Sequence, residues 1–343
     1  MKKIIFILLF LLSIPTFSIA MDHKLIVSYW SDGPLYKNYP IKNNADLNQK
    51  ISDINVLAYA FMQVDKNGHI YFQYPLSDLS ESDVNGFCKS NSPFCQNVKT
   101  TRFEGNFDAF SKLNNKQHNL QKIISIGGST SDATLNNALN HPNKFVKSAK
   151  TIIQYYHLNG IDLDFEPSGL FSKIQSDQYA FLVNLLRKQL EKTAYISIEL
   201  PGDNETLNSL GRKNLDSISK NAYISLMGYE FHSAFYKPYI TGNNSNLYSD
   251  SNEPNINHFY HISDDQAVKH LTFMGVPSDK IILGFPAYFH AYGDVKNVNN
   301  GLYQSFNRIP PIIPPHHFNY DVLNEDSIFL PNSICANAKR SNS

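Results

Sequence analysis

Three acidic side chains stand at alternate positions near the middle of the chain. Asp162, Asp164 and Glu166 occupy positions i, i+2 and i+4, with one apolar residue between each pair. Because side chains alternate between the two faces of a strand, these three carboxylates would share one face. The intervening apolar residues favour a buried strand over a solvent-facing acidic edge. A metal site is the other interpretation of such a pattern.

An acidic cluster of this kind suits general acid catalysis. Like charges held close together raise the pKa of one of them, which keeps a carboxylic acid protonated near neutral pH. Glu166 comes last, at the carboxyl end of the predicted strand, where a substrate would meet it. We therefore predict that Glu166 is the proton donor and that Asp162 and Asp164 support it. Glu199 adds an acid to a later strand, and the sequence assigns it no role.

Strands and helices alternate around this cluster. Three segments show the helical spacing of apolar residues, at 142–156, 176–191 and 264–274. Alternating strands and helices predict a parallel sheet, and seven or eight such units over 343 residues favour a barrel over an open sheet. The chain has neither a GxGxxG nor a P-loop pattern, so nothing supports nucleotide binding. The predicted strands cover residues 24–30, 54–61, 122–128, 160–166, 194–200, 222–229 and 280–288.

Two long polar segments follow predicted strands, at residues 65–106 and 232–261. In a barrel of this type they lie on the carboxyl face, which carries the active site. Cys88 and Cys95 lie close together in the first segment, and we expect a disulfide between them, with Cys335 left over. Two cysteines without a matching His pair make a poor zinc site, so we predict no metal.

Charge and the N-terminus restrict the class of protein. Lys plus Arg and Asp plus Glu are 30 each, so the basic footprint of a nucleic-acid-binding protein is absent. Lys2 and Lys3 precede an apolar run at 4–14, and small residues at 18 and 20 offer a cleavage site. This pattern predicts a signal peptide at 1–20. We expect a secreted chain, extracellular or periplasmic, that starts near Met21 and has no membrane contact after cleavage.

Four motifs carry a resemblance to a known family. Residues 159–166, Asn-Gly-Ile-Asp-Leu-Asp-Phe-Glu, resemble the D-G-x-D-x-D-x-E signature of glycoside hydrolase family 18, the chitinase family. Residues 125–128 (Ser-Ile-Gly-Gly), 227–232 (Met-Gly-Tyr-Glu-Phe-His) and 280–288 are similar to its third, sixth and seventh strand motifs. The stretch 299–304 also resembles bacterial members. The resemblance implies an α/β fold, a (β/α)₈ TIM barrel over residues 21–308, followed by an irregular segment at 309–343.

The resemblance also implies a mechanism that needs no cofactor. Glu166 would protonate the glycosidic oxygen, and the N-acetyl group of the substrate would attack the anomeric carbon to give an oxazolinium intermediate. Asp164 would orient the acetamide N–H, Tyr229 would hydrogen-bond the acetamide oxygen, and Asp162 would hold or relay charge behind Asp164. The implied activity is retaining endo-hydrolysis of β-1,4-linked N-acetylglucosamine polymers, such as chitin or chitooligosaccharides, by a monomer.

Further residues are expected to contact the sugar. Gly127 and Gly128 either allow close approach of the substrate or form a tight turn. Glu230 stands where the family has Asp, and it contacts the substrate or is displaced. Trp30 is a sugar platform or, the default, a core residue. The expected substrate-binding residues are Gly127, Gly128, Met227, Glu230, Tyr29 and Phe61.

The end of the chain departs from the family pattern. Family members close the barrel with an eighth strand that bears a Trp beneath the sugar, but no Trp follows residue 30 here. We therefore expect the eighth strand to be divergent or missing. Pro167 also replaces an aromatic residue that is common beside the acid. Two kinds of alternative stay open. One is a weak or silent lectin-like protein that binds chitin or N-acetylglucosamine, and the other is an endo-β-N-acetylglucosaminidase that acts on N-glycans or a peptidoglycan hydrolase.

Overall fold

The computed structural model describes most of the chain between residues 25 and 307. The described residues are 25–31, 51, 53–95, 105–113, 119–129, 131–233, 239–254, 262–288, 290 and 292–307. The predicted signal peptide at 1–20, the irregular segment at 309–343 and Cys335 lie outside these residues, so the predictions made for them are not tested by the structure.

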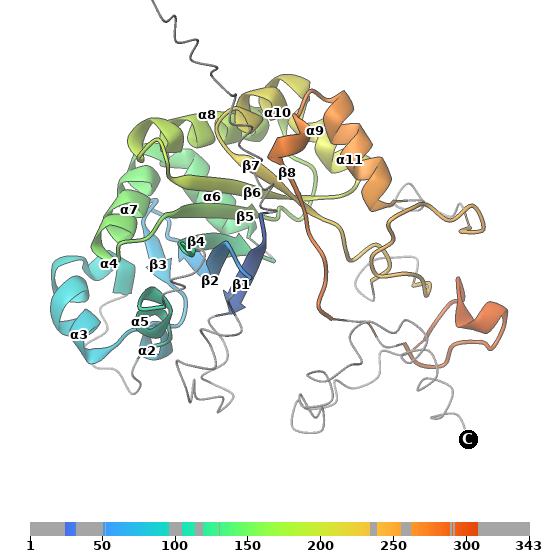
Figure 1. The fold of residues 1–343 in the computed structure, drawn as a ribbon, viewed down its shortest axis with the longest axis horizontal. Coiled ribbons are helices and arrows are strands. Elements are labelled where there is room, and N and C mark those ends of the chain that lie inside the picture. Colours follow the sequence, from blue (N-terminus) through green and yellow to red (C-terminus); the bar gives the residue numbers. More distant parts are fainter. Residues whose placement is uncertain are drawn as a thin grey trace, which may run out of the picture.

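A curled parallel sheet forms the centre of the fold (Figure 1). Its order follows the sequence, β1-β2-β4-β5-β6-β7-β8, and every neighbouring pair is parallel. All seven predicted strands are therefore confirmed, and the sheet has the half-closed form of a (β/α)₈ TIM barrel. The strands are β1 (Val27–Ser31), β2 (Val56–Val64), β4 (Gln121–Gly128), β5 (Gly160–Phe165), β6 (Tyr195–Pro201), β7 (Tyr223–Met227) and β8 (Ile281–Leu283).

The first and last strands of the sheet, β1 and β8, do not pair with each other in the described part of the chain. β1 and β8 are the edges of the sheet, and no eighth parallel strand joins them within the described part of the chain. β8 stops at Leu283, five residues before the predicted end at 288, because Gly284 and Pro286 interrupt it. Both edges expose apolar side chains, since Tyr29 on β1 is 42% exposed and Leu283 on β8 is 44% exposed.

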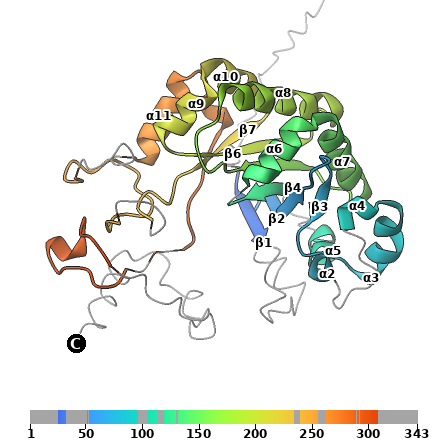
Figure 2. The ribbon, with the colours of Figure 1, turned by 180° about the vertical axis from the view of Figure 1, so that it is seen from behind.

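Helices cover the outer, convex face of the sheet (Figures 1 and 2). Helix α8 begins at Lys173, earlier than the predicted 176, because Ser172 and Gln175 form a capping box at its start. The buried Tyr179 of α8 donates its hydroxyl to the carbonyl oxygen of Leu163 on β5, at 3.1 Å. The outer helices are α6 (Asp132–Asn140), α7 (Pro142–Tyr155), α8 (Lys173–Gln189), α9 (Asn204–Leu210), α10 (Arg212–Ser219) and α11 (Asp264–Phe273).

The region at 65–106 is more ordered than the predicted polar loop. Strand β3 (Ile70–Phe72) pairs antiparallel with β2, because both its end residues are buried in the core. Phe72 packs edge-on against Phe107, with ring centroids 5.0 Å apart. The Cys88–Cys95 disulfide is present, with Cα atoms 5.6 Å apart, as the sequence predicted. The short helices here are α2 (Pro75–Asp78), α3 (Glu81–Asp83), the π-helical turn η2 (Val84–Cys88), α4 (Ser92–Cys95) and α5 (Asn106–Ser111).

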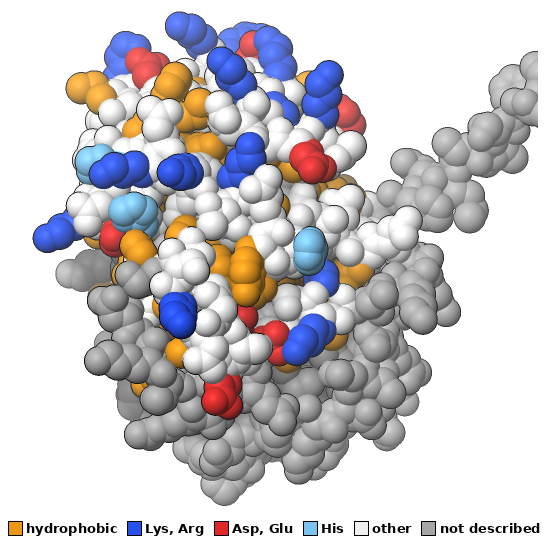
Figure 3. Space-filling model, turned by 90° about the vertical axis from the view of Figure 1, so that its left-hand side faces the viewer, with side chains coloured by type: hydrophobic (Ala, Val, Ile, Leu, Met, Phe, Trp, Pro, Cys, Tyr) orange, Lys and Arg blue, Asp and Glu red, His pale blue; other side chains and the backbone are white. Residues whose placement is uncertain are grey.

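The surface of the helical layer carries the basic side chains. Figure 3 shows Lys and Arg spread over one face of this layer, with neutral and acidic side chains among them. Ion pairs of the i,i+4 type join lysines to acids on the helices, such as Lys220 with Asp216 at 2.7 Å and Lys269 with Asp265 at 2.7 Å. Among the helices that the structure describes, none combines the length and the apolar character that a bilayer crossing requires.

Candidate active site

The register of the central strands places two serines beside Asp162. Ser125 of β4 and Ser197 of β6 stand opposite Asp162 on its two sides. Ser197 donates its hydroxyl to Asp162 Oδ1 and Ser125 donates to Asp162 Oδ2, each at 2.6 Å. Asp162 is fully buried, and that burial outweighs its hydrogen bonds to raise its pKa to about 6. Asp162 thus lies deepest in the cluster, removed from water but hydrogen-bonded at both carboxylate oxygens.

Tyr29, on the edge strand β1, joins the hydrogen bonds around Asp162 from across the sheet. The Tyr29 hydroxyl lies 2.6 Å from Glu199 Oε1 and 3.2 Å from Asp162 Oδ2. Tyr29 as a whole is 42% exposed, because β1 is an edge, but its hydroxyl end lies among the acids. Glu199, on β6, is only 5% exposed. The structure thus places Tyr29 in the acid cluster, where its substrate-binding role stays a prediction.

Asp164 lies opposite Gly127, at the carboxyl end of the neighbouring strand β4. It is 6% exposed, and its Oδ1 atom is buried without a hydrogen-bond partner within the described residues. Burial raises its pKa well above the usual value, and the nearby charges of Glu166, Glu199 and Asp162 raise it further. Such an atom is available to a ligand that brings its own donor.

Gly127 and Gly128 make room for protein neighbours. Gly127 stands opposite Asp164, and a Cβ there would overlap the Asp164 carbonyl oxygen. A Cβ on Gly128 would meet the Phe61 ring at 2.8 Å. Both glycines have positive φ, of 124° and 88°, which disfavours other residues. The structure describes close packing of protein neighbours at these glycines, and their contact with a sugar stays a prediction.

Glu166 follows the last residue of β5, at the rim of the sheet. Its backbone N–H donates to the Ser131 hydroxyl at 2.7 Å, which fixes the turn that carries its side chain. Glu166 is half-buried, and burial followed by the charge of Glu230 raises its pKa. These two effects favour the protonated form that a general acid needs.

The segments that follow β7 and β8 contribute a second group of polar residues. Glu230 Oε1 accepts from the Tyr288 hydroxyl at 2.7 Å and lies 3.0 Å from His290 Nε2. Its Oε2 atom is buried without a hydrogen-bond partner within the described residues. The half-buried Tyr229 packs edge-on against Tyr288, with centroids 6.1 Å apart, and burial raises its pKa. Met227, at the end of β7, is 9% exposed.

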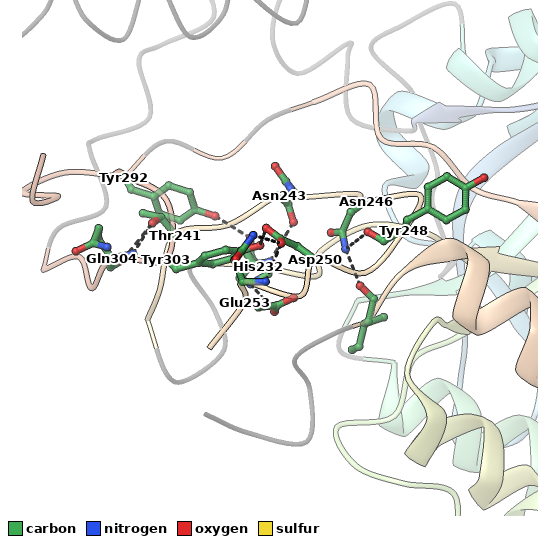
Figure 4. Close-up of polar contacts among 12 residues, drawn as sticks. His232, Thr241, Asn243, Asn246, Tyr248, Asp250, Glu253, Tyr292, Tyr303 and Gln304 are labelled. Carbon is green, nitrogen blue, oxygen red and sulfur yellow. Dashed lines mark hydrogen bonds and ion pairs between the residues drawn. The ribbon is translucent and has the colours of Figure 1, made fainter. Parts of the chain in front are cut away.

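Trp30 and His232 are held in place by contacts with their neighbours. Trp30 donates its indole N–H to Asn106 Oδ1 at 2.9 Å and packs against Phe110, which fits the core reading. His232 lies in another network, shown in Figure 4. Its Nε2 atom is 3.1 Å from Glu253 Oε1, and its carbonyl oxygen accepts from the Tyr292 hydroxyl at 2.7 Å. His232 therefore ties residues 239–254 to residues 292–307.

Sequence reasoning missed Ser197 and Ser131 and gave Glu199 no function. Ser197 and Glu199 are both on β6, two positions apart, on the same face as the β5 acids. Aligning neighbouring strands in register would have found Ser197, which stands opposite Asp162. Within the described residues, no group of three or more His, Cys, Asp and Glu side chains is arranged to hold a metal ion.

Known proteins resemble this chain over most of its length. It is 28% identical over 274 residues to endochitinase 1 of Metarhizium robertsii, a match that covers 76% of this chain and 59% of the fungal protein. It is 27% identical over 215 residues to mouse chitotriosidase-1, covering 57% of this chain and 44% of that protein. The chain thus matches about three fifths of the fungal relative.

A solved structure shows the fold of this chain, and a family-wide sequence comparison shows its family. Chitinase ChiA74 from Bacillus thuringiensis has a TM-score of 0.66 and 24% identity, covering 82% of this chain and 51% of that one, which shows the shared fold. The sequence model of Glycosyl hydrolases family 18 matches residues 25–343. Because that match spans nearly the whole chain, this protein belongs to glycosyl hydrolases family 18.

Proposed function

We propose that this protein is a retaining endo-hydrolase of β-1,4-linked N-acetylglucosamine polymers, of the kind found in chitin. The observation that carries the proposal is the row of acids along β5, in which the buried Asp162 and Asp164 lead to the half-buried Glu166 at the rim. Membership of the family and the similarity to chitinases support the substrate class.

The reaction begins with the transfer of a proton from Glu166 to the glycosidic oxygen, which leaves with the aglycone. The carbonyl oxygen of the substrate's N-acetyl group attacks the anomeric carbon at the same time and forms an oxazolinium ring. Glu166, now ionised, takes a proton from a water molecule that opens this ring. The two displacements retain the configuration at the anomeric carbon.

Asp164 and Tyr229 act on the acetamide group. The unpartnered Asp164 Oδ1 accepts the acetamide N–H, and its negative charge stabilises the positive oxazolinium. Tyr229 donates its hydroxyl to the acetamide oxygen and aligns it for attack. Asp162, held by Ser125 and Ser197, supports Asp164 from behind.

Around these acids, the remaining residues shape the sugar site. Glu230, braced by Tyr288 and His290, presents its unpartnered Oε2 atom to a sugar hydroxyl. We further propose that Gly127, Gly128, Met227, Tyr29 and Phe61 line the wall of the same site.

Hydrolysis of a fluorogenic chitobioside or chitotrioside tests the proposal. Glu166→Gln keeps the size of the side chain but removes its proton chemistry, so kcat should fall by about 10²- to 10⁴-fold. That loss is about 3 to 5 kcal/mol of transition-state stabilisation. Glu205→Gln, at an exposed position on α9, is the matched control and should retain wild-type turnover.

The assay also separates the alternatives. A folded wild type without turnover that binds chitooligosaccharides in calorimetry would be a sugar-binding protein instead. Turnover of N-glycans but not of chitooligosaccharides would make it an endo-β-N-acetylglucosaminidase. Proton NMR of the first product should show the β-anomer, and an α-anomer would contradict the retaining mechanism.

Export of the chain is part of the proposal. The basic residues Lys2 and Lys3, followed by the apolar run, support a cleaved signal peptide. N-terminal sequencing of the exported protein should find Met21 or a neighbouring residue first.

A further inference from the structure

Four carboxylic acids share the interior of the sheet, and none of them has a basic partner among the residues that the structure describes. Asp162, Asp164 and Glu199 are each at most 6% exposed, and Glu166 is half-buried beside them. Within the described residues, the ion pairs of Lys, Arg and His involve other acids, and none reaches these four. Four buried negative charges without a cation would be very costly, so some of these acids must hold their protons.

The hydrogen bonds show which acid is best prepared to be ionised. Asp162 has three hydroxyl groups around its two oxygens, from Ser125, Ser197 and Tyr29. Hydrogen bonds to the charged form favour that form. Glu199 has fewer: its neighbours are the Tyr29 hydroxyl at 2.6 Å and the Ser225 side chain.

One hydroxyl stands between two acids and carries a single proton. Tyr29 can donate to one acceptor only, although its oxygen can also accept. If it donates to Asp162, the short contact to Glu199 is a hydrogen bond only when Glu199 donates to the Tyr29 oxygen. The hydrogen bonds then run from Glu199 through Tyr29 to Asp162. The Glu199 proton points at the Tyr29 oxygen, and the Tyr29 proton points at Asp162.

We propose that Glu199 is a positioning residue of this site, which keeps its proton and donates it to Tyr29 so that the Tyr29 hydroxyl is directed at an ionised Asp162. The proposal rests on the hydrolytic function proposed above. It gives a role to an acid that neither protonates the substrate nor touches it. Ionisation of Glu199 would withdraw the Tyr29 proton from Asp162 and add a further negative charge behind Asp164.

Several titratable groups face Glu199 and shape its protonation. Burial is the largest effect, and it raises the pKa of Glu199 well above the usual value, with the charge of Asp162 next. The two hydrogen bonds act in the opposite direction, but they do not outweigh burial. The facing groups are Asp162 and Asp164 on β5, Glu166 directly after β5, Tyr29 on β1, Tyr229 after β7, Tyr195 on β6 and Tyr179 on α8.

Kinetics of four variants test the role of Glu199 in the reaction. Glu199→Ala should lower kcat on the order of tenfold, with a smaller change in KM, and Glu199→Gln, which keeps a donor and stays neutral, should recover most of that loss. Tyr29→Phe should resemble Glu199→Ala. The Tyr29→Phe/Glu199→Ala double variant should be no slower than the slower single variant, since both act through one chain of hydrogen bonds.

The alkaline limb of the kcat/KM profile distinguishes a neutral Glu199 from an ionised one. A neutral Glu199 predicts that this limb coincides in the wild type and Glu199→Gln. An ionised Glu199 predicts a shift of the limb to lower pH by about one unit in Glu199→Gln, because a negative charge near Glu166 has been removed. That shift, or additive losses in the double variant, would overturn the proposal.

Infrared spectroscopy shows whether Glu199 carries its proton, and this measurement does not depend on enzymatic activity. At pH near 7, Glu199→Gln should remove a carbonyl band of a protonated carboxylic acid, whereas the control Glu205→Gln should remove a carboxylate band. Loss of a carboxylate band in Glu199→Gln would overturn the proposal. A folded wild type that hydrolyses nothing would refute the proposed function instead, and the infrared result would then decide the protonation of Glu199 alone. If Glu199→Ala does not fold, Glu199→Gln and Tyr29→Phe still carry the test.

Discussion

Replacing Asp162 with Asn should reduce the loss of stability that the folded chain undergoes between about pH 4 and pH 7. In the folded state, burial raises the pKa of Asp162 from 3.8 to about 6. An unfolded chain releases the proton earlier as the pH rises, so the folded state binds more protons across this window. The contribution of Asp162 to stability is therefore fully present below the unfolded pKa and is lost as the pH rises through about 6.

The size of the effect follows from the two pKa values. They differ by about 2 units, and one unit corresponds to about 1.4 kcal/mol, so the wild type should lose about 3 kcal/mol from this group. Asn does not titrate, and it retains an oxygen for the hydroxyl of Ser125 or Ser197. Groups remote from the site contribute equally to both proteins and cancel in the difference between their free energies of unfolding. The charge of Asp162 also raises the pKa of Asp164 and Glu199, so the difference includes that effect.

Urea unfolding at half-unit steps of pH measures this difference. The wild type should lose up to about 3 kcal/mol relative to Asp162→Asn as the pH rises from about 4 to about 7. Asp177→Asn on α8 is a control of opposite sign, since hydrogen bonds from Asn214 and Lys173 lower the pKa of this exposed acid. Its contribution is lost only as the pH falls below 3.8. A difference between the wild type and Asp162→Asn that stays flat or reverses over pH 4 to 7 would refute the reasoning.

Two further substitutions and the reduction of the disulfide test other contacts that stabilise the fold. Gly127→Ala should lower the free energy of unfolding, measured in urea, by at least about 2 kcal/mol, because a Cβ would overlap the backbone of the neighbouring strand and φ is 124°. The control Gly169→Ala, where a Cβ would meet nothing within 4 Å, should lower it far less, and equal losses would contradict this packing. Replacing Glu253 with Ala should cost about 3 kcal/mol, since it removes the buried carboxylate next to His232, and an unchanged melting temperature would exclude that contribution. Reducing the Cys88–Cys95 disulfide, which closes a loop of sequence separation 7, should lower the free energy of unfolding by about 2.5 kcal/mol, a value that unfolding with and without a reductant checks.

Local patterns predicted the strands and the common face of the acids. Strand β5 spans Gly160–Phe165, within one residue of the prediction, because an alternation of period two depends only on neighbouring residues. The disulfide was predictable for a similar reason, since both cysteines lie within a few residues of each other. Helix α8 shows the limit of the pattern: its apolar spacing located the helix, but the capping box at Ser172 determined where it begins.

Contacts that depend on how the sheet curls were not predictable. Tyr29 is 133 positions from Asp162 and 170 from Glu199, yet its hydroxyl reaches both. Nothing local in β1 indicates that its tyrosine crosses the interior, because that depends on the tilt and closure of the strands. Strand β3 was missed for another reason: three residues give too little periodicity, and the segment is a strand because it pairs with β2 and buries Ile70 and Phe72.

Burial of the acids connects the stability of this protein to its proposed activity. Removal from water favours the neutral form of Asp164 and Glu199, and it raises the pKa of Glu166 as well. Because the same desolvation keeps the proton on the catalytic acid and penalises the ionised cluster, turnover and folded stability should both decline on the alkaline side. A substitution that relieves the penalty by admitting water should then improve alkaline stability and impair catalysis together. Glu166 therefore acts in the neutral form that burial favours, whereas the proposed negative charges of Asp162 and Asp164 are held against the same burial penalty.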